Sequence, residues 1–347
     1  MMQPEGFKEG NELRCKLHKS LYGLKQAGRR WNACFTHFLE KFELVPLKTD
    51  HCVYKNMAYD LDDKSKESVL IALYVDDGLI MSNSNALIEK VVRRLRGAFE
   101  VTVGDATSYV SLQIIFGNDR INLKREQYIK RRAHLIRMDE PAQVTTPLNP
   151  SVKYCRLRVV GGEAEEDSPA PYRQIIGTLM YLSNSTRPDL VHAMCSLSRF
   201  NEHPKASHWE AGKRVTRYAI TTQDRCLKHV KNRDGLKLTC YSDADYGDDR
   251  DDRKSISGVF LLINGTPVVW RSAKQTKVAG STAVAEFVAA ALATKECLWV
   301  RNFLSETGLE QREPTQLFVD NQTAICLISN NQVHAKTKAL DLDLLFV

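Results

Sequence analysis

The first clear pattern of apolar and polar positions is a run of seven apolar residues at 69–75, followed by Asp76-Asp77-Gly78 and a second apolar run at 79–81. The first run is too short to span a membrane, and it begins and ends with the β-branched residue valine. Aspartate and glycine favour tight turns, so the pattern predicts a β-hairpin with its turn at Asp76-Asp77-Gly78. Two neighbouring carboxylates would then lie at the tip of this hairpin.

Two amphipathic helices are predicted on either side of the hairpin. Upstream, apolar residues at positions 33, 35, 38, 39 and 42 follow helical spacing, and we expect this helix to continue from residues 21–31 and to end before Pro46. Downstream, residues 85–99 have an apolar face opposite the basic residues Lys90, Arg93, Arg94 and Arg96. We expect the second helix to pack against the domain that contains the hairpin.

The last third of the chain contains four predicted strands. Residues 236–245 alternate between apolar and polar and end in carboxylates. Residues 257–270 form two strands joined at Asn264-Gly265, a pair typical of two-residue hairpin turns. A further strand is predicted at residues 315–319.

Two helices complete this region. An alanine-rich helix is predicted from the N-cap Ser281 to about residue 303, with Glu286 one turn after its start. Asp320 ends the last strand, and a second helix is expected from Asn321. Acidic residues therefore lie at two strand ends and in one early helical turn.

A linker is predicted between these regions, because residues 145–171 contain four prolines, a Gly-Gly pair and an acidic cluster. Three amphipathic helical pieces follow at 172–182, 186–190 and 208–218. The sequence thus predicts a first domain, a linker, a helical connection region and a final domain at residues 1–144, 145–171, 172–230 and 231–347.

The composition, 43% hydrophobic and 26% charged over 347 residues, is that of a soluble globular protein with room for two or three domains. The net charge of +7 has the sign expected for a polyanion partner. Nine cysteines without a Cys-x-x-Cys pair indicate neither a disulfide framework nor a zinc knuckle, so we expect an intracellular, reducing setting. No signal peptide and no membrane-spanning segment are predicted.

The two adjacent carboxylates Asp76 and Asp77 are the first candidate for chemistry. At ~4 Å and an effective dielectric constant of ~20, two unit charges repel by roughly 4 kcal/mol. A divalent cation, helped by a third carboxylate, would turn this repulsion into a Mg²⁺ site for phosphoryl chemistry. The alternative is an ordinary Asp-Asp-Gly turn, which forms for backbone reasons.

Two basic segments are candidates for phosphate binding. Lys25, Arg29 and Arg30 precede the first helix, and residues 124–137 contain six basic residues against Glu126, a net charge of +5. Clustered cations bind nucleic acid by displacing its counterions. A solvated basic helix face remains the alternative for both segments.

The combination of Tyr74-Val75-Asp76-Asp77 with the segment LHKSLYGLKQAGRRW at residues 17–31 closely resembles the reverse transcriptase of copia-type retrotransposons. The resemblance implies that Asp76 and Asp77 are two of three aspartates that hold metal ions in the polymerase palm. It also implies that Gln26 lies at the nucleotide site. Further contacts to nucleotide or template are expected from Lys25, Arg30 and Tyr74.

Two departures from the family pattern concern this region. In the family, the strand with the first catalytic aspartate lies upstream of the segment that matches residues 2–7, so we expect the polymerase metal site of this chain to be incomplete. Residues 109–115 correspond to the family's primer-grip hairpin, which typically has glycine where this chain has Ser111. A side chain there is expected to hinder a close backbone approach.

The order of strand, hairpin, helix, strand and helix in the last third resembles the ribonuclease H fold. The resemblance extends to residues 251–258 and to Lys274-Gln275. It implies that Asp243, Glu286 and Asp320 hold two Mg²⁺ ions, with Mn²⁺ as an alternative. These ions would support hydrolysis of RNA in an RNA/DNA hybrid.

A fourth acid completes such a site in the family, and Asp341 is the best match, although Leu345-Phe346 replaces the usual His-Phe pair and the chain stops at Val347. Among the other nearby acids, only Asp245 is a substitute candidate for one of the three.

The sequence therefore favours a mixed α+β and α/β protein: a partial reverse transcriptase palm and connection region followed by a ribonuclease H-like domain. Nucleic acid, as an RNA/DNA hybrid or template-primer, and the remainder of a Pol polyprotein are the expected partners, in a cytoplasmic virus-like particle or in the nucleus. A catalytically silent nucleic-acid-binding remnant is the alternative. An unrelated stand-alone nuclease is a third hypothesis, which the residue 74–77 hairpin argues against.

Overall fold

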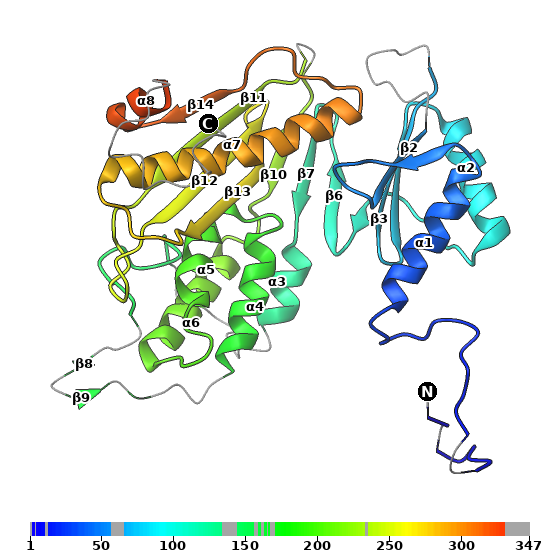
Figure 1. Cartoon of the computed structure of the whole chain (residues 1–347), viewed down its shortest axis with the longest axis horizontal. Coiled ribbons are helices and arrows are strands. Elements are labelled where there is room, and N and C mark those ends of the chain that lie inside the picture. The colour runs from blue at the N-terminus through cyan, green and yellow to red at the C-terminus, as the bar shows by residue number, and fades with distance from the viewer. Residues whose placement is uncertain are drawn as a thin grey trace. The chain divides into compact units, whose positions relative to one another are not determined.

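The computed structural model describes residues 2–3, 5–10, 13–56, 66–133, 144–155, 159–160, 163–164, 166, 171–232 and 235–329 (Figure 1). The chain divides into two compact units. The first comprises Met1–Val103 and Glu306–Gly308, and the second comprises Gly104–Ser305 and Leu309–Val347. Both units combine helices with sheets, which agrees with the mixed α and β class expected from the sequence.

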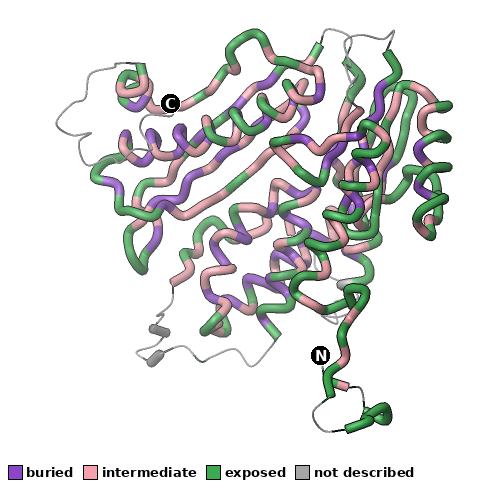
Figure 2. The backbone as a smooth tube through the Cα atoms, turned by 45° about the vertical axis from the view of Figure 1, so that its right-hand side comes forward, coloured by how far each residue is buried: buried purple, intermediate pink, exposed green. Residues whose placement is uncertain are grey.

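In the first unit, two helices and a four-stranded antiparallel sheet of order β1-β2-β3-β4 enclose one core. The elements are α1 (Ala27–Glu40), β1 (Leu44–Pro46), β2 (Val53–Asn56), β3 (Val69–Tyr74), β4 (Asp77–Ser82) and α2 (Asn85–Ala98). Both helices expected near the hairpin are therefore confirmed. The core, drawn purple in Figure 2, takes from each helix and from the central strands residues such as Phe35, Leu39, Tyr54, Ile71 and Val91.

The hairpin of β3 and β4 is confirmed, but its predicted turn at Asp76-Asp77-Gly78 is wrong by one residue. Tyr74 pairs with Asp77, so the turn residues are Val75 and Asp76. Val75 adopts φ +54°, a left-handed conformation that is unfavourable for a β-branched side chain. The indole Nε1 of Trp31 in α1 donates a hydrogen bond to the Val75 carbonyl oxygen at 2.7 Å and anchors this turn.

The second unit begins with a sheet of order β10-β7-β6-β5. Its strands are β5 (Ser108–Tyr109), β6 (Leu112–Phe116), β7 (Arg120–Lys124) and β10 (Leu227–Val230), and α3 (Glu126–Ala133) follows β7. The hairpin turn between β5 and β6 consists of Val110 and Ser111, with φ +48° and +59°. The position that is typically glycine in the family is thus a left-handed turn position, which glycine adopts without strain.

A helical bundle forms the middle of the second unit. Its elements are α4 (Tyr172–Ser183), the 3₁₀ turn η2 (Pro188–Leu190), α5 (Val191–Ser198) and α6 (Ala206–Thr221). The three predicted helical pieces correspond to α4, η2 and α6, and α5 was not predicted. Val144, Leu148 and Tyr154 pack against its core, and the Cys155 carbonyl oxygen lies 3.1 Å from His208 Nε2. Part of the segment predicted as a linker therefore packs on this bundle, and the two units divide at residues 103 and 104, upstream of that segment.

The last sheet has the order β13-β12-β11-β14, in which only the β11–β14 pair is parallel. The strands are β11 (Leu238–Ala244), β12 (Ile256–Ile263), β13 (Thr266–Lys274) and β14 (Gln316–Val319), and the helices are α7 (Thr282–Glu306) and α8 (Gln322–Ser329). The predicted turn at Asn264-Gly265 is confirmed, with φ +49° and +77°. Helix α7 covers one face of this sheet (Figure 1) and shares with it a core that includes Cys240, Leu261 and Val300.

Within the described part of the basic segment at residues 124–137, Lys130 and Arg131 are exposed, whereas Arg125 differs from both interpretations. Arg125 is buried, donates to the Val110 carbonyl oxygen and to the Tyr181 hydroxyl, and lies over the Tyr181 ring. Lys124 and Lys130 both pair with Glu126. Residues 134–137 lie outside the described part of the chain.

A short two-stranded sheet also forms between β8 (Val159–Val160) and β9 (Glu163–Ala164).

None of the helices within the described residues is both long enough and apolar enough to cross a membrane.

Candidate metal centre

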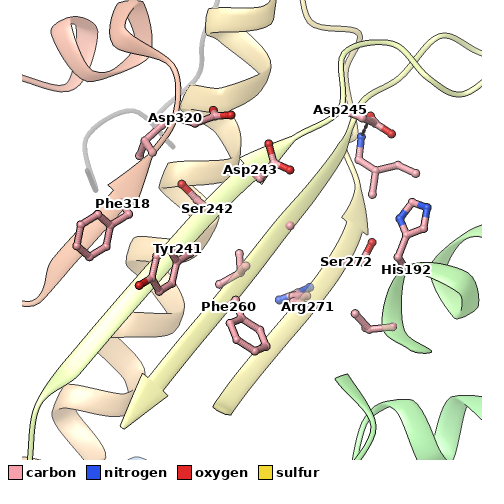
Figure 3. Close-up of a pocket in the computed structure, with 15 residues that line it drawn as sticks. His192, Tyr241, Ser242, Asp243, Asp245, Phe260, Arg271, Ser272, Phe318 and Asp320 are labelled. Atoms are coloured by element: carbon pink, nitrogen blue, oxygen red, sulfur yellow. Dashed lines mark hydrogen bonds between the residues drawn. The ribbon is translucent and has the colours of Figure 1, made fainter. Parts of the chain in front are cut away.

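Three elements of the second unit bring three carboxylates together. Asp243 lies near the end of β11, Asp320 directly follows β14, and Glu286 lies in the first turns of α7. Because β11 and β14 are parallel neighbours with Ser242 opposite Val319, the two aspartates reach the same level of the sheet (Figure 3). One carboxylate oxygen from each of the three acids lies within 4.8 Å of the others.

Glu286 is the buried member of this cluster, with 6% of its surface exposed. Its Oε1 accepts a hydrogen bond from the Ala244 backbone N–H at 3.1 Å, whereas its buried Oε2 has no hydrogen-bond partner. Burial, followed by the negative charges of Asp243 and Asp320, raises the pKa of Glu286 to about 7, against the opposing effect of the Ala244 N–H.

The three acids fit a divalent cation on these observations. A buried carboxylate oxygen without a donor loses its solvation and gains nothing in return. Oxygen ligands from several carboxylates are the set that Mg²⁺ and Mn²⁺ prefer. A cation among the three would satisfy Glu286 Oε2 and remove the repulsion between the carboxylates.

Gln275 fixes the first turn of α7 against the sheet, a role that its sequence context did not indicate. Its buried amide Nε2 donates to Ser257 Oγ at 3.0 Å and to the Ala285 carbonyl oxygen at 2.9 Å. The residue next to Glu286 is thereby tied to β12. As expected, Ser281 is the N-cap, and its Oγ accepts from the Val284 N–H at 3.3 Å.

The loop after β11 is held by a buried carboxylate that the sequence did not single out. Asp249, with a side chain that is 1% exposed, forms ion pairs with Arg199 and with Lys274, the latter at 2.5 Å. Burial opposes its ionisation, but the hydrogen bond from Lys274 and the nearby charges hold the pKa of Asp249 below its usual value. Asp249 lies between the C-terminal end of α5 and β13. These contacts form only in the folded protein, so the run of acidic loop residues in the sequence did not reveal them.

Asp245 lies beside this site but outside the three-acid cluster. Its Oδ1 accepts from the Ile256 N–H at 2.5 Å, and burial raises its pKa. Asp245, Asp243 and Asp320 line one cavity of about 600 Å³, together with aromatic residues of the sheet and His192 of α5 (Figure 3). Asp341, the fourth predicted acid, lies outside the described residues.

The predicted polymerase residues all belong to the first unit. Asp76 and Asp77 are exposed at the tip of the β3–β4 hairpin, and no third His, Cys, Asp or Glu joins them among the described residues. The predicted substrate contacts are likewise exposed: Lys25, Gln26, Arg30 and Tyr74.

Comparison with known proteins gives a consistent set of relatives. The family model described as reverse transcriptase (RNA-dependent DNA polymerase) matches residues 1–150. Over 98% of its length, the chain is 36% identical to the retrovirus-related Pol polyprotein from transposon TNT 1-94 of Nicotiana tabacum. Over its full length, it is 32% identical to the retrovirus-related Pol polyprotein from transposon RE1 of Arabidopsis thaliana. These alignments cover 26% and 23% of the two relatives, so the chain spans about a quarter of their length.

A shorter relative is covered almost completely. The chain is 31% identical over 281 residues to a putative transposon Ty5-1 protein of Saccharomyces cerevisiae, an alignment that spans 78% of this chain and 86% of the relative.

Proposed function

The chain belongs to the family of copia-type retrotransposon Pol polyproteins, and from this premise we propose that residues 231–347 form a ribonuclease H-like domain that hydrolyses the RNA strand of RNA/DNA hybrids. Residues 1–150 are a reverse transcriptase region. The proposal concerns the chemistry of the second unit.

The convergence of Asp243, Glu286 and Asp320 within 4.8 Å is the observation that carries this proposal. The three acids come from two strand ends and one helix, so their proximity is a product of the tertiary fold. The unpartnered Oε2 of Glu286 supports a cation at the same place. The sheet order β13-β12-β11-β14, with β14 parallel to β11, agrees with a ribonuclease H-like arrangement.

Divalent ions bound at such a site activate water for attack on a phosphodiester and stabilise the leaving oxygen. The exposed carboxylates of Asp243 and Asp320 would hold these ions on the solvent side, and Glu286 would hold them from the buried side through Oε2. The Ala244 N–H fixes the other oxygen of Glu286, which keeps that carboxylate oriented. The expected products have 3′-hydroxyl and 5′-phosphate ends, with Mg²⁺ as the ion and Mn²⁺ as the alternative.

The polymerase residues remain proposals for the longer Pol protein. We propose Asp76 and Asp77 as two of its metal ligands, and Lys25, Gln26, Arg30 and Tyr74 as contacts to nucleotide or template. The remainder of a Pol polyprotein is the proposed partner.

Cleavage of a labelled RNA strand within an RNA/DNA hybrid tests the proposed function. The purified chain should cut with Mg²⁺ and not with EDTA. Asp243→Asn should abolish cutting, and Asp76→Asn, the matched control in the first unit, should leave it unchanged. A folded chain that binds the hybrid but never cuts it would contradict the proposal and leave a nucleic-acid-binding remnant.

A further inference from the structure

A row of aromatic side chains crosses the last sheet beside the acids. Phe318 of β14 is paired with Tyr241 of β11, Tyr241 with Phe260 of β12, and Phe260 with Trp270 of β13. Directly opposed residues of neighbouring strands lie on the same face of a sheet. One aromatic residue from each strand therefore lies on this face, and Figure 3 shows Phe318, Tyr241 and Phe260 in that order across it.

The two ends of this aromatic row differ in their exposure. Trp270 is partly buried, and its Nε1 donates to the Ser183 carbonyl oxygen of α4 at 2.6 Å, so the helical bundle covers this end. At the other end, Tyr241 and Phe318 are 44% and 46% exposed. Their rings stack with centroids 5.0 Å apart and 18° between their planes. The bundle thus leaves a stacked aromatic pair open to solvent.

The metal-binding candidates lie in the adjoining row of the same face. Asp243 and Asp320 follow Tyr241 and Phe318 by two positions each, a step that returns to the same face and advances by roughly 7 Å. Opposite Asp243 on β12 lies Gly258, where an added Cβ would meet only the Asp243 carbonyl oxygen, at 3.7 Å. The cavity of about 600 Å³ is lined by the acids of this row and by Tyr241, Phe260 and Phe318 of the aromatic row. A nucleotide with its phosphate at the acids would therefore place its base near the aromatic pair.

We propose that the outer ring faces of the Tyr241–Phe318 pair, those not turned toward each other, form a stacking platform for one unpaired nucleobase of the RNA strand, next to the phosphate that is cut. This inference rests on the proposed function, because the acids would hold the neighbouring phosphate. Every base has a π face that stacks on tyrosine or phenylalanine, whatever the sequence. A base inside a duplex already has both faces covered by its neighbours. The platform therefore favours RNA that leaves the hybrid beside the cut over RNA that is fully paired.

Binding of two labelled hybrids to the full chain with Ca²⁺ in place of Mg²⁺ tests this inference. Ca²⁺ can hold the phosphate at the carboxylates, but its larger and flexible coordination does not meet the octahedral geometry of Mg²⁺, so binding is measured without cleavage. One hybrid has blunt ends, and the other has a short unpaired RNA extension that contains 2-aminopurine, tested at either end of the strand. Stacking quenches 2-aminopurine fluorescence. We expect the extended hybrid to bind about 5- to 100-fold more tightly than the blunt one, as for one base stacked on an aromatic side chain.

Substitutions at the platform should remove this preference. Tyr241→Leu and Phe318→Leu keep apolar volume but remove the ring, so they should equalise the two affinities and abolish the quenching. Tyr241→Phe should retain both. Trp299→Leu is the matched control. Trp299 is 46% exposed, and its ring stacks on that of Phe303 of α7 with the ring centroids 5.7 Å apart, but it does not line the cavity. Unchanged Mn²⁺ affinity of the two leucine variants would show that their fold is intact.

The results separate this inference from the proposed function. Equal binding of both hybrids by the wild-type chain, or a preference that survives Tyr241→Leu and Phe318→Leu, would overturn the platform. The proposed hydrolysis is judged independently by Mg²⁺-dependent cutting. A chain that shows ring-dependent quenching but never cuts would retain the platform and lose the ribonuclease activity.

Discussion

Replacing Glu286 with glutamine should stabilise the metal-free second unit at alkaline pH. Its carboxylate is buried, lacks a partner at Oε2, and is repelled by Asp243 and Asp320. The pKa of Glu286 is therefore raised from 4.5 to about 7, so ionisation costs folding free energy. For a carboxyl group whose pKa is raised on folding, this cost is absent below the unfolded pKa and complete above the folded one.

The size of the effect follows from these two values. Each unit of difference between the unfolded and folded pKa values corresponds to about 1.4 kcal/mol, so the ionised carboxylate destabilises the metal-free fold by at most about 3 kcal/mol. Glutamine keeps the shape and removes the charge, but it introduces an amide that also needs a partner. We expect Glu286→Gln to raise the free energy of unfolding by about 1–2 kcal/mol at pH 8 and to have little effect at pH 5.

Urea unfolding in EDTA at pH 5 and pH 8, followed by tryptophan fluorescence, measures this difference. Three of the four tryptophans, at positions 209, 270 and 299, belong to the second unit. The matched control is Glu296→Gln on the same helix, whose carboxylate pairs with Arg271 at 2.7 Å and should therefore give no gain at pH 8. A Glu286→Gln variant that is no more stable than wild type at pH 8, or that gains equally at pH 5, would show that the ionised Glu286 carboxylate does not destabilise the fold.

Three further substitutions test other parts of the fold by the same unfolding measurement. Val75→Gly should stabilise the first unit by about 0.5–1 kcal/mol, because glycine accepts φ +54° without strain; a loss would contradict this. Asp249→Asn should lower the free energy of unfolding by about 2–4 kcal/mol near neutral pH. Asp252→Asn, at a more exposed carboxylate, should lower it by less than about 1 kcal/mol. Because the pKa of Asp249 is lowered, its contribution should disappear as pH falls through that value; a pH-independent cost would contradict the ion pairs. Gly265→Ala, at φ +77°, should cost about 1–2 kcal/mol, and a neutral result would contradict the turn geometry.

Local sequence rules predicted the elements whose causes are local. The Asn264-Gly265 turn forms because both residues tolerate left-handed conformations, and the helix after Ser281 begins where a capping hydroxyl is available. The turn at Val75 failed as a prediction because its conformation is imposed from outside the hairpin. The hydrogen bond from Trp31 and the register of the sheet determine it.

Charge patterns were the least informative part of the sequence. Arg125 occurs in a basic run that suggests a solvated face, yet it is buried on Tyr181. Asp249 occurs among exposed loop acids, yet it is the buried one. Periodicity likewise did not predict that Asp243, Glu286 and Asp320 would converge. The family resemblance suggested these three acids, and their role as metal ligands stays a prediction.

Counting the Mn²⁺ ions bound to the chain by electron paramagnetic resonance shows whether Asp243, Glu286 and Asp320 hold a metal ion. We expect Mn²⁺ to bind to the wild-type chain, and this binding to be lost in Asp243→Asn and Asp320→Asn. It should be preserved in Asp76→Asn, whose carboxylate lies in the other unit. Mn²⁺ binding that is unchanged in both Asp243→Asn and Asp320→Asn would contradict a metal site at these carboxylates.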